Sequence, residues 1–205
     1  MNSIGTVVAS GPRWATVTRS TKETQITVTL KLDGTGETNI ETGVGFFDHL
    51  LNSMAHHALF DLDVEAAGDL VIDEHHTVED VSLVLGAALA QALGDRSGIA
   101  RFGDFAVPMD EAVATCVVDA GGRPYAVVDL PFKGKRAGKM PLELIEHTLE
   151  SFARAGGVTL NLKGRGRNDH HLAEAAFKAL GRALCAAVTV DPRRQGPAST
   201  KGALG

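Results

Sequence analysis

Two copies of one short motif, His-His-x-x-Glu, stand out in the 205-residue chain, in the segments DEHHTVEDV and NDHHLAEAA. On a helix, residues three or four positions apart share a face, so the Glu of each copy lies beside its histidines. Adjacent histidines diverge by about 100° around a helix, and each can therefore face a different ion. Imidazole and carboxylate groups together bind divalent transition metals such as Mn, Fe, Zn and Ni.

Each copy has a further histidine upstream, His49 in the first half and His147 in the second. The predicted metal ligands are six histidines and two glutamates: His49, His75, His76, Glu79, His147, His170, His171 and Glu174. Divided between the copies, they give three His and one Glu for each of two ions. Such a set leaves positions open on an octahedral ion, which favours catalysis over a structural role. One such motif alone is more often a cap or a surface feature, but the duplication makes metal binding the stronger interpretation.

The predicted strands and helices that must position these residues also occur twice in the sequence. A β-rich stretch at 22–34 with alternating apolar residues is matched by one at 110–122, and each carries a Glu in second position, Glu23 or Glu111. A helical stretch with one His follows each, then a strand, and then the helix that begins with the motif. Asp73 and Asp169, which adjoin the motifs, are predicted helix N-caps. Equivalent residues of the two copies are 88, 95 or 98 positions apart, as small changes in loop length would cause.

The sequence therefore predicts one α/β (α+β) domain, residues 1–205, built from an internally duplicated β-β-β-α-β-α unit. The first repeat is predicted to span 13–100 and the second 101–192. The Gly/Pro-rich segment 193–205 is predicted to be a flexible tail, and KGKRAGKM from Lys133 a loop. We expect two pseudo-symmetric halves, with helices in the middle and sheets outside.

Composition and charge exclude several classes of function. Apolar residues make up 44% of the chain, and the net charge is −5 without a basic stripe, so a nucleic-acid partner is not expected. No apolar run approaches the ~20 residues that a membrane helix needs, and no secretory signal is evident at the N-terminus. We therefore expect a cytoplasmic protein without a membrane partner.

The motifs carry a resemblance to a known family. The segments GFFDHLLNSMAHH, DEHHTVEDV and NDHHLAEAAFKALGRAL and the tail segment ASTKG resemble imidazoleglycerol-phosphate dehydratase, over nearly the whole chain from Arg13 to Lys201. The chain looks like the monofunctional form, without an added phosphatase domain. The resemblance implies a lyase of histidine biosynthesis that converts D-erythro-imidazole-glycerol phosphate to imidazole-acetol phosphate.

The resemblance also implies a particular architecture and assembly. A helical bundle would lie between two four-stranded sheets. Each active site would hold two Mn²⁺ ions. The assembly would be a 24-mer built from trimers, with active sites between subunits and with metal promoting assembly.

Roles for individual residues follow from the same resemblance. Glu23 would lie by the substrate and donate the proton that the departing hydroxyl needs. The alternative is that Glu23 is an ordinary exposed residue of a strand, without a catalytic role. His49 is expected to contact the substrate. For His57, which has no counterpart in the second half, a structural role competes with a substrate contact. The phosphate is expected to bind a set of cationic and hydroxyl side chains: Arg101, Arg123, Lys178, Ser199 and Lys201.

The chemistry of this substrate fits the histidine-rich ligand set. The eliminated proton sits on a carbon that also carries a hydroxyl, so its direct abstraction would be slow. A divalent cation on the substrate's ring favours the imidazolate form, which can expel the hydroxyl next to the ring and give a diazafulvene-like intermediate with an acidic C–H. The base for this proton is a ligand carboxylate, Glu79 or Glu174, or a metal-bound water, and the sequence does not choose among them.

Two other functions fit a paired metal site. A dinuclear metallohydrolase activates water between metals, but its sites usually include Asp ligands and metals ~4 Å apart. A non-catalytic metal cage would have closed coordination and no need for Arg101, Arg123 or Lys201. The dominance of histidine favours ring-nitrogen chemistry over the metallohydrolase, and the cage is distinguished by its prediction that substitution of Arg101 by Ala leaves function unchanged.

Overall fold

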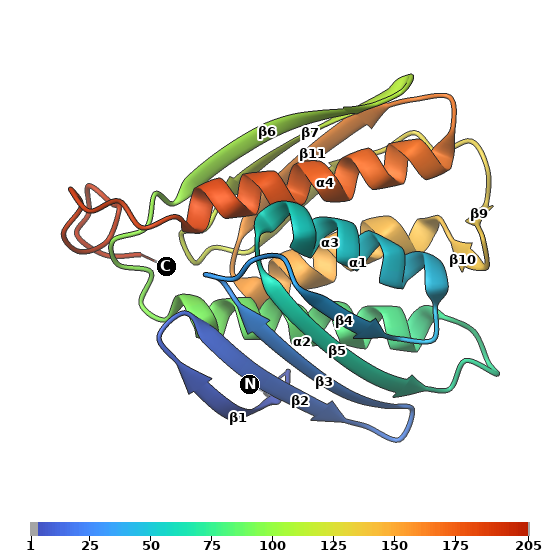
Figure 1. Ribbon diagram of the computed structural model, residues 1–205, viewed down its shortest axis with the longest axis horizontal. Helices are drawn as coiled ribbons and strands as arrows, with labels where there is room; N and C mark the ends of the chain where they lie inside the picture. Colours follow the sequence, from blue (N-terminus) through green and yellow to red (C-terminus); the bar gives the residue numbers. More distant parts are fainter. Residues whose placement is uncertain (1–3, 205) are drawn as a thin grey trace.

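The computed structural model describes residues 4–204 (Figure 1). The first half contains β1 (Thr6–Gly11), β2 (Trp14–Ser20), β3 (Thr24–Lys31), β4 (Thr38–Glu41), α1 (Gly45–Ala58), β5 (Asp61–Gly68) and α2 (His75–Leu93). The second half contains β6 (Phe102–Met109), β7 (Ala112–Asp119), β8 (Tyr125–Asp129), β9 (Arg136–Ala137), β10 (Met140–Pro141), α3 (Glu143–Gly156), β11 (Thr159–Arg165) and α4 (Asp169–Val188).

The two main sheets have the same topology. Their strand orders are β1-β2-β3-β5-β4 and β6-β7-β11-β8, so β2, β3, β5 and β4 correspond to β6, β7, β11 and β8. In each sheet the strand after the first helix pairs antiparallel with one neighbour and parallel with the other. The predicted α/β class and the duplicated β-β-β-α-β-α unit are confirmed.

Details of the fold differ from the prediction in three places. The first sheet has five strands rather than four, because Thr6–Gly11, which precedes the predicted repeat, pairs with β2. The predicted loop from Lys133 contains a hairpin of two-residue strands, β9 and β10. Both N-cap predictions are off by one residue. Glu74 occupies the N-cap of α2, and Asp73 before it accepts from the His75 N–H. Asn168 caps α4 by accepting from the His170 N–H, while the Asp169 carboxylate accepts from the backbone of the Lys133 loop.

The four helices lie between the two sheets, with α2 against β2 and β3 and α4 against β6 and β7 (Figure 1). Each of these helices also packs against the first helix of the other half, α2 against α3 and α4 against α1. Gly86 in α2 and Gly181 in α4, 95 residues apart, allow this close approach. A Cβ on either would collide with a backbone carbonyl of the facing helix, that of Phe152 or Met54. The glycines thus set which helix faces meet between the halves.

Burial follows the pleat of the strands. In β3 the side chains of Ile26, Val28 and Leu30 point into the core and alternate with more exposed threonines. Within residues 4–204, none of the helices combines the length and the hydrophobicity required to cross a bilayer.

Candidate metal centres and anion pocket

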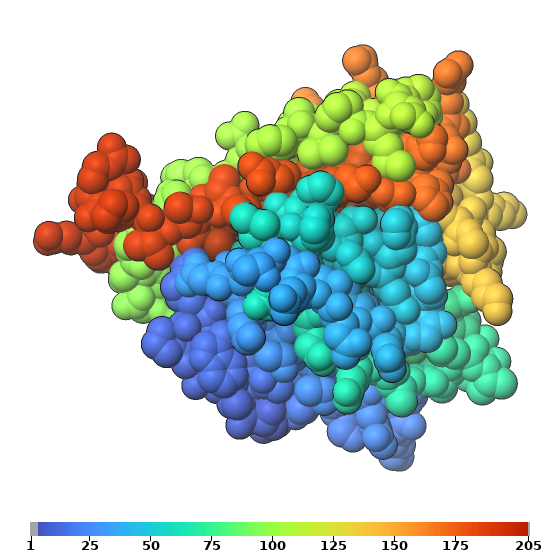
Figure 2. All heavy atoms as spheres, in the orientation of Figure 1, coloured from blue at the N-terminus to red at the C-terminus, as the bar shows by residue number. Residues whose placement is uncertain are grey.

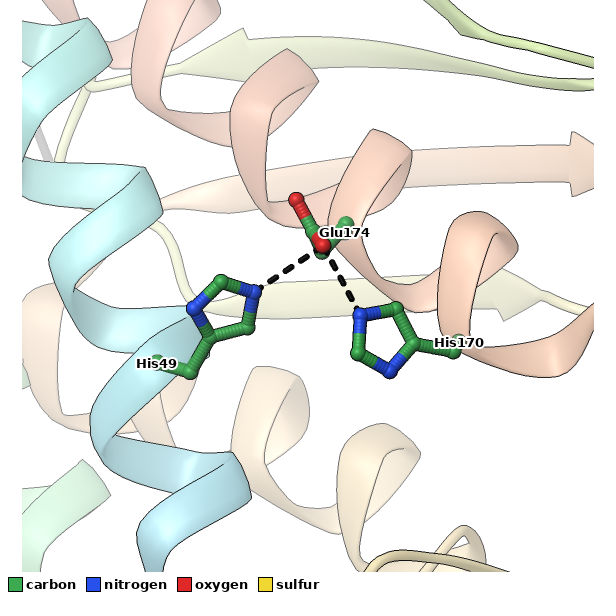
Figure 3. A group of neighbouring side chains, drawn as sticks. All are labelled: His49, His170 and Glu174. Carbon is green, nitrogen blue, oxygen red and sulfur yellow. Dashed lines mark hydrogen bonds and ion pairs between the residues drawn. The ribbon is translucent and has the colours of Figure 1, made fainter.

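One His–Glu cluster lies where α1 meets the start of α4, and it joins His49, His170 and Glu174 (Figure 3). His170 and Glu174 are four residues apart on one face of α4, and His49 reaches them from α1. The Nε2 atoms of both histidines lie 2.9 Å from Oε1 of Glu174. The other carboxylate oxygen, Oε2, lies 2.7 Å from Nζ of Lys178, one helical turn further along α4.

The Glu174 carboxyl group is nearly buried, with 8% of its side chain exposed. Burial acts to raise its pKa, but the contacts with Lys178, His49 and His170 outweigh burial and lower the pKa to about 2. Glu174 is therefore an anion at neutral pH, already surrounded by its donors.

A second cluster lies where α2 meets α3, and it joins His75, Glu79 and His147. Its contacts are longer: Nε2 of His75 is 3.7 Å from Oε2 of Glu79, and Nε2 of His147 is 3.6 Å from Oε1. The guanidinium of Arg154 lies 3.6 Å from the same Oε1. Nε2 of His147 is buried and has no hydrogen-bond partner among residues 4–204.

Both clusters suit a divalent transition metal. In each, two imidazole nitrogens and one carboxylate oxygen lie within 4.8 Å of one another. A buried ring nitrogen without a partner, as in His147, is a polar group that an ion would satisfy. Each cluster takes its single histidine from one half of the chain and its motif residues from the other. This exchange follows from the packing of α1 against α4 and of α3 against α2.

The remaining predicted ligands, His76 and His171, stand outside the clusters. Nδ1 of His76 lies 3.0 Å from Oδ2 of Asp69, and Nδ1 of His171 lies 2.9 Å from Oε2 of Glu111. A hydrogen bond to Asp69 raises the pKa of His76, and a hydrogen bond to Glu111 raises that of His171. The chain brings two His and one Glu together in each cluster, and the third His for each ion stays a prediction.

The two strand glutamates, equivalent in the repeat, have different surroundings. Glu111 accepts from the backbone N–H groups of Arg167 and Asn168 and from His171, and these contacts, that from His171 first, lower its pKa to about 2. The side chain of Glu23 is 55% exposed, and its Oε2 is 3.9 Å from Nδ1 of His76. Glu23 therefore keeps its carboxylate available, while that of Glu111 is occupied.

The predicted phosphate ligands, Lys178 excepted, gather around a cavity of about 510 Å³ at the other end of α4. Its lining includes Arg101, Arg123, Ser199 and Lys201, together with Arg194, which the sequence analysis did not single out. The Arg101 guanidinium binds both oxygens of Asp119 and the carbonyl of Ala198, so it holds the tail against the wall of the cavity. The bond to Arg101, opposed by burial, lowers the pKa of Asp119.

The tail packs against the loop that follows α2. Pro197 pairs with Ser97, and the Gly98 N–H donates to the carbonyl of Gly196. In the space-filling view the segment after α4 projects from one end of the molecule (Figure 2). The flexibility of this tail stays a prediction.

Lys178 and His57 lie near the first cluster rather than near the cavity. Lys178 contacts Glu174, and the neighbouring charges of His56, Lys178 and Arg182, after burial itself, lower the pKa of His57. The Arg101 N–H donates to the carbonyl of Ala187, thirteen residues beyond Glu174 on α4. At 1.5 Å per residue, the cavity and the cluster are about 20 Å apart along the helix.

Known proteins resemble the chain closely. Residues 42–184 match the sequence profile of the family described as Imidazoleglycerol-phosphate dehydratase. An imidazoleglycerol-phosphate dehydratase of Methanoculleus marisnigri is 53% identical over 94% of this chain and 100% of its own length. The chain belongs to the imidazoleglycerol-phosphate dehydratase family. It is therefore a dehydratase, and hence a lyase, of histidine biosynthesis.

Solved structures of the dehydratase family share the fold. The enzyme of Staphylococcus aureus aligns with a TM-score of 0.79 and 33% identity, over 87% of this chain and 99% of that one. The enzyme of Pyrococcus furiosus, in complex with (S)-C348, aligns with a TM-score of 0.79 and 34% identity, over 91% of this chain and 99% of that one. The profile match at 42–184 includes all eight predicted metal ligands but not Glu23, Ser199 or Lys201.

Sequence reasoning missed Asp69, Arg154 and Arg194, which the structure places beside predicted site residues. Asp69 lies seven residues before His76, in the loop between β5 and α2, so no helical spacing links the two. Arg154 reaches Glu79 from a different helix. The neighbouring Arg193 and Arg194 of the tail looked alike in sequence, but only Arg194 lines the cavity.

Proposed function

We propose that the chain dehydrates D-erythro-imidazole-glycerol phosphate to imidazole-acetol phosphate in the cytoplasm, with two Mn²⁺ ions per active site. The observation that carries this proposal is the pair of His–Glu clusters, each assembled across the two halves of the chain. A divalent ion held there would favour the deprotonated form of the substrate's imidazole ring.

The residues of the chain supply the acid for the elimination. Loss of the hydroxyl requires a proton donor within hydrogen-bonding reach. Glu23 fits this role because its carboxyl group is exposed and lies at the edge of the motif histidines. Its counterpart Glu111 is engaged by a histidine and two backbone amides and is held ionised, which makes it a poor donor.

The base for the C–H proton is one of the two ligand carboxylates. Both oxygens of Glu174 are occupied, by two histidines and by Lys178. The oxygens of Glu79 have looser contacts, at 3.6 Å or more. Glu79 is therefore the better candidate for the base, with Glu174 as a ligand that binds and orients.

The phosphate would bind in the cationic cavity of Arg101, Arg123, Ser199 and Lys201. A three-carbon chain joins ring to phosphate in this substrate, far shorter than the about 20 Å between cavity and cluster in one chain. A complete site therefore needs the first cluster of one copy and the cavity of another. This geometry supports a homo-oligomer with sites between subunits, which we propose to be a 24-mer of trimers.

The decisive experiment is a coupled assay for imidazole-acetol phosphate on chelated protein and on protein reconstituted with Mn²⁺. We expect activity only after reconstitution. Phosphatase or amidase activity of the manganese form without dehydration would favour the metallohydrolase instead. An Arg101→Ala variant separates the enzyme from a metal cage, because it should lose phosphate affinity while its metal content stays unchanged.

The assembly has its own test. Light scattering on the same two samples should show a particle of 24 copies with Mn²⁺ and smaller species after chelation. Active protein that remains a monomer would contradict the shared site, since one chain separates its cavity from its first cluster.

The tail is tested by truncation before Ser199. Because Ser199 and Lys201 line the cavity, their loss should raise KM sharply and leave the metal content intact. An unchanged KM would remove the tail from the phosphate site.

A further inference from the structure

His76 and His171 make the same kind of contact with carboxylates from different places in the repeat. In the second half, His171 contacts Glu111 on the loop before β7. In the first half, the equivalent of Glu111 is Glu23, but its carboxylate stays 3.9 Å from His76. Asp69, from the loop after β5, takes that place at 3.0 Å.

No carboxylate is available at the position equivalent to Asp69 in the second half. The sheet registers pair Gln25 with Ala67 and Val113 with Arg165, so the residue equivalent to Asp69 is Arg167, and its neighbours are Gly166 and Asn168. In the second half the close contact with the histidine is therefore made by Glu111, at 2.9 Å, while Asp110 stays 3.9 Å away. In the first half Asp69 makes a second carboxylate redundant for this purpose.

Both acidic residues are anchored by backbone hydrogen bonds. The Asp69 N–H donates to the carbonyl of Glu23, which fixes the main chains of the two residues side by side. The Oε1 atom of Glu111 accepts from the N–H groups of Arg167 and Asn168, just before the helix that carries His171. The Glu111 carboxylate itself, and the main chain that carries Asp69, are therefore held in place before any ion binds.

We infer that Asp69 and Glu111 are positioning residues for His76 and His171, and that Asp69 also frees Glu23 to act on the substrate. A carboxylate only accepts, so it fixes the proton on Nδ1 and leaves the Nε2 lone pair directed away from the carboxylate, toward an ion. The inference rests on the proposed function, because it takes His76 and His171 as ligands of the proposed Mn²⁺ ions.

The first readout is the tautomer of each ring in chelated protein, from ¹⁵N chemical shifts at a pH where the rings are neutral. The wild type should show both rings protonated at Nδ1. Asp69→Ala should allow the His76 proton to move away from Nδ1. Asp69→Asn, which keeps an accepting oxygen, should restore protonation at Nδ1. Glu111→Gln should move the His171 proton to Nε2, because an amide NH₂ that faces Nδ1 donates to it.

The second readout is Mn²⁺ affinity by titration. Loss of a partner that orients a ligand histidine costs about 10–100-fold in affinity, and we expect this for Asp69→Ala and for Glu111→Gln. Glu23→Gln should leave Mn²⁺ affinity unchanged and lower kcat. The control is Asp63→Ala, which removes a carboxylate of β5 whose one hydrogen bond within residues 4–204 comes from Asn39, and which should change neither readout.

The inference is overturned if Asp69→Ala keeps both the wild-type tautomer and the wild-type Mn²⁺ affinity, or if Glu23→Gln weakens Mn²⁺ binding as much as Asp69→Ala does. Failure of the proposed function looks different. In that case the wild type would bind Mn²⁺ with the expected dependence on Asp69 and still form no imidazole-acetol phosphate.

Discussion

In one cluster Glu174 lies 2.9 Å from both of its histidines, whereas in the other Glu79 lies 3.7 and 3.6 Å from its own. The two glutamates are equivalent in the repeat, and so are the histidines around them. The positively charged side chains that approach the two glutamates are not equivalent. Glu174 is paired with Lys178 on its own helix, while the equivalent position in α2 is Leu83, and Arg154 approaches Glu79 from α3 instead.

The duplication therefore preserved the predicted ligands and changed their surroundings. The first cluster is closed by direct contacts before an ion binds, with its carboxylate nearly buried. The second is open, with a buried Nε2 of His147 left without a partner among residues 4–204. An ion must displace existing contacts in the first cluster, and it completes missing ones in the second.

The largest effect should come from Glu174→Gln. The amide weakens a ligand, and it also leaves Lys178 and two histidines without their anion. Loss of an orienting partner costs about 10–100-fold, so loss of a ligand charge should reduce kcat/KM by at least about 100-fold. Steady-state kinetics and metal analysis check this result.

Glu79→Gln is the matched variant for the other cluster. Activity should again be lost, because a ligand charge is lost. The melting temperature of the chelated protein should fall less than for Glu174→Gln, since the contacts of Glu79 are longer and its side chain is 30% exposed against 8% for Glu174. Equal losses of apo stability would remove the distinction between a closed and an open cluster.

A smaller effect is expected for Lys178→Met, which removes the cation 2.7 Å from Glu174. A hydrogen bond to a charged group contributes about 1.5–3 kcal/mol to stability, so the free energy of unfolding of the chelated protein should fall by about this amount, and kcat/KM should fall because Glu174 is less well oriented. Metal content should stay at the wild-type level, because Lys178 competes with an ion for the carboxylate. Loss of the metal together with the activity would show that Lys178 holds the cluster together instead.

The pH dependence of stability in chelated protein tests the closed cluster directly. The pKa of Glu174 in the folded protein, about 2, lies below its ordinary value of 4.5. A depressed carboxyl pKa stabilises the folded state above pH 4.5, and this contribution is lost as the pH falls from 4.5 toward 2. Glu174→Gln should therefore flatten the acid limb of unfolding free energy, with Glu111 contributing part of the remaining slope. A limb as steep as that of the wild type would contradict this reading.

The sequence predicted the repeated unit and the ligand types because both depend on local spacing. The four-residue separation of His170 and Glu174 places them on one helix face wherever that helix packs. Spacing along one helix cannot tell which other helix supplies the third group. That choice depends on the contact of Gly181 with the backbone of Met54 in α1, and of Gly86 with that of Phe152 in α3.

Contacts made by loops were the least predictable part. Asp69 and the β1 strand lie outside any regular sequence pattern. Asp69 contacts His76 from a loop, and β1 forms because it pairs with the edge strand β2. His57 had no counterpart in the second half, so only its position near Lys178 and Arg182 relates it to the first cluster. Repeats in a sequence thus predict what two sites share, and the structure is needed for what separates them.

The smallest effect should come from Arg154→Met, the counterpart of Lys178→Met at the open cluster. The guanidinium is 63% exposed and lies 3.6 Å from Glu79, and exposed ion pairs of this kind contribute little. We expect kcat/KM to stay within about twofold of the wild type. The free energy of unfolding of the chelated protein should stay within a few tenths of a kcal/mol of the wild type. A loss of kcat/KM as large as that of Lys178→Met would mean that Arg154 orients Glu79 as Lys178 orients Glu174. The two clusters would then differ only in the helix that supplies the positively charged side chain.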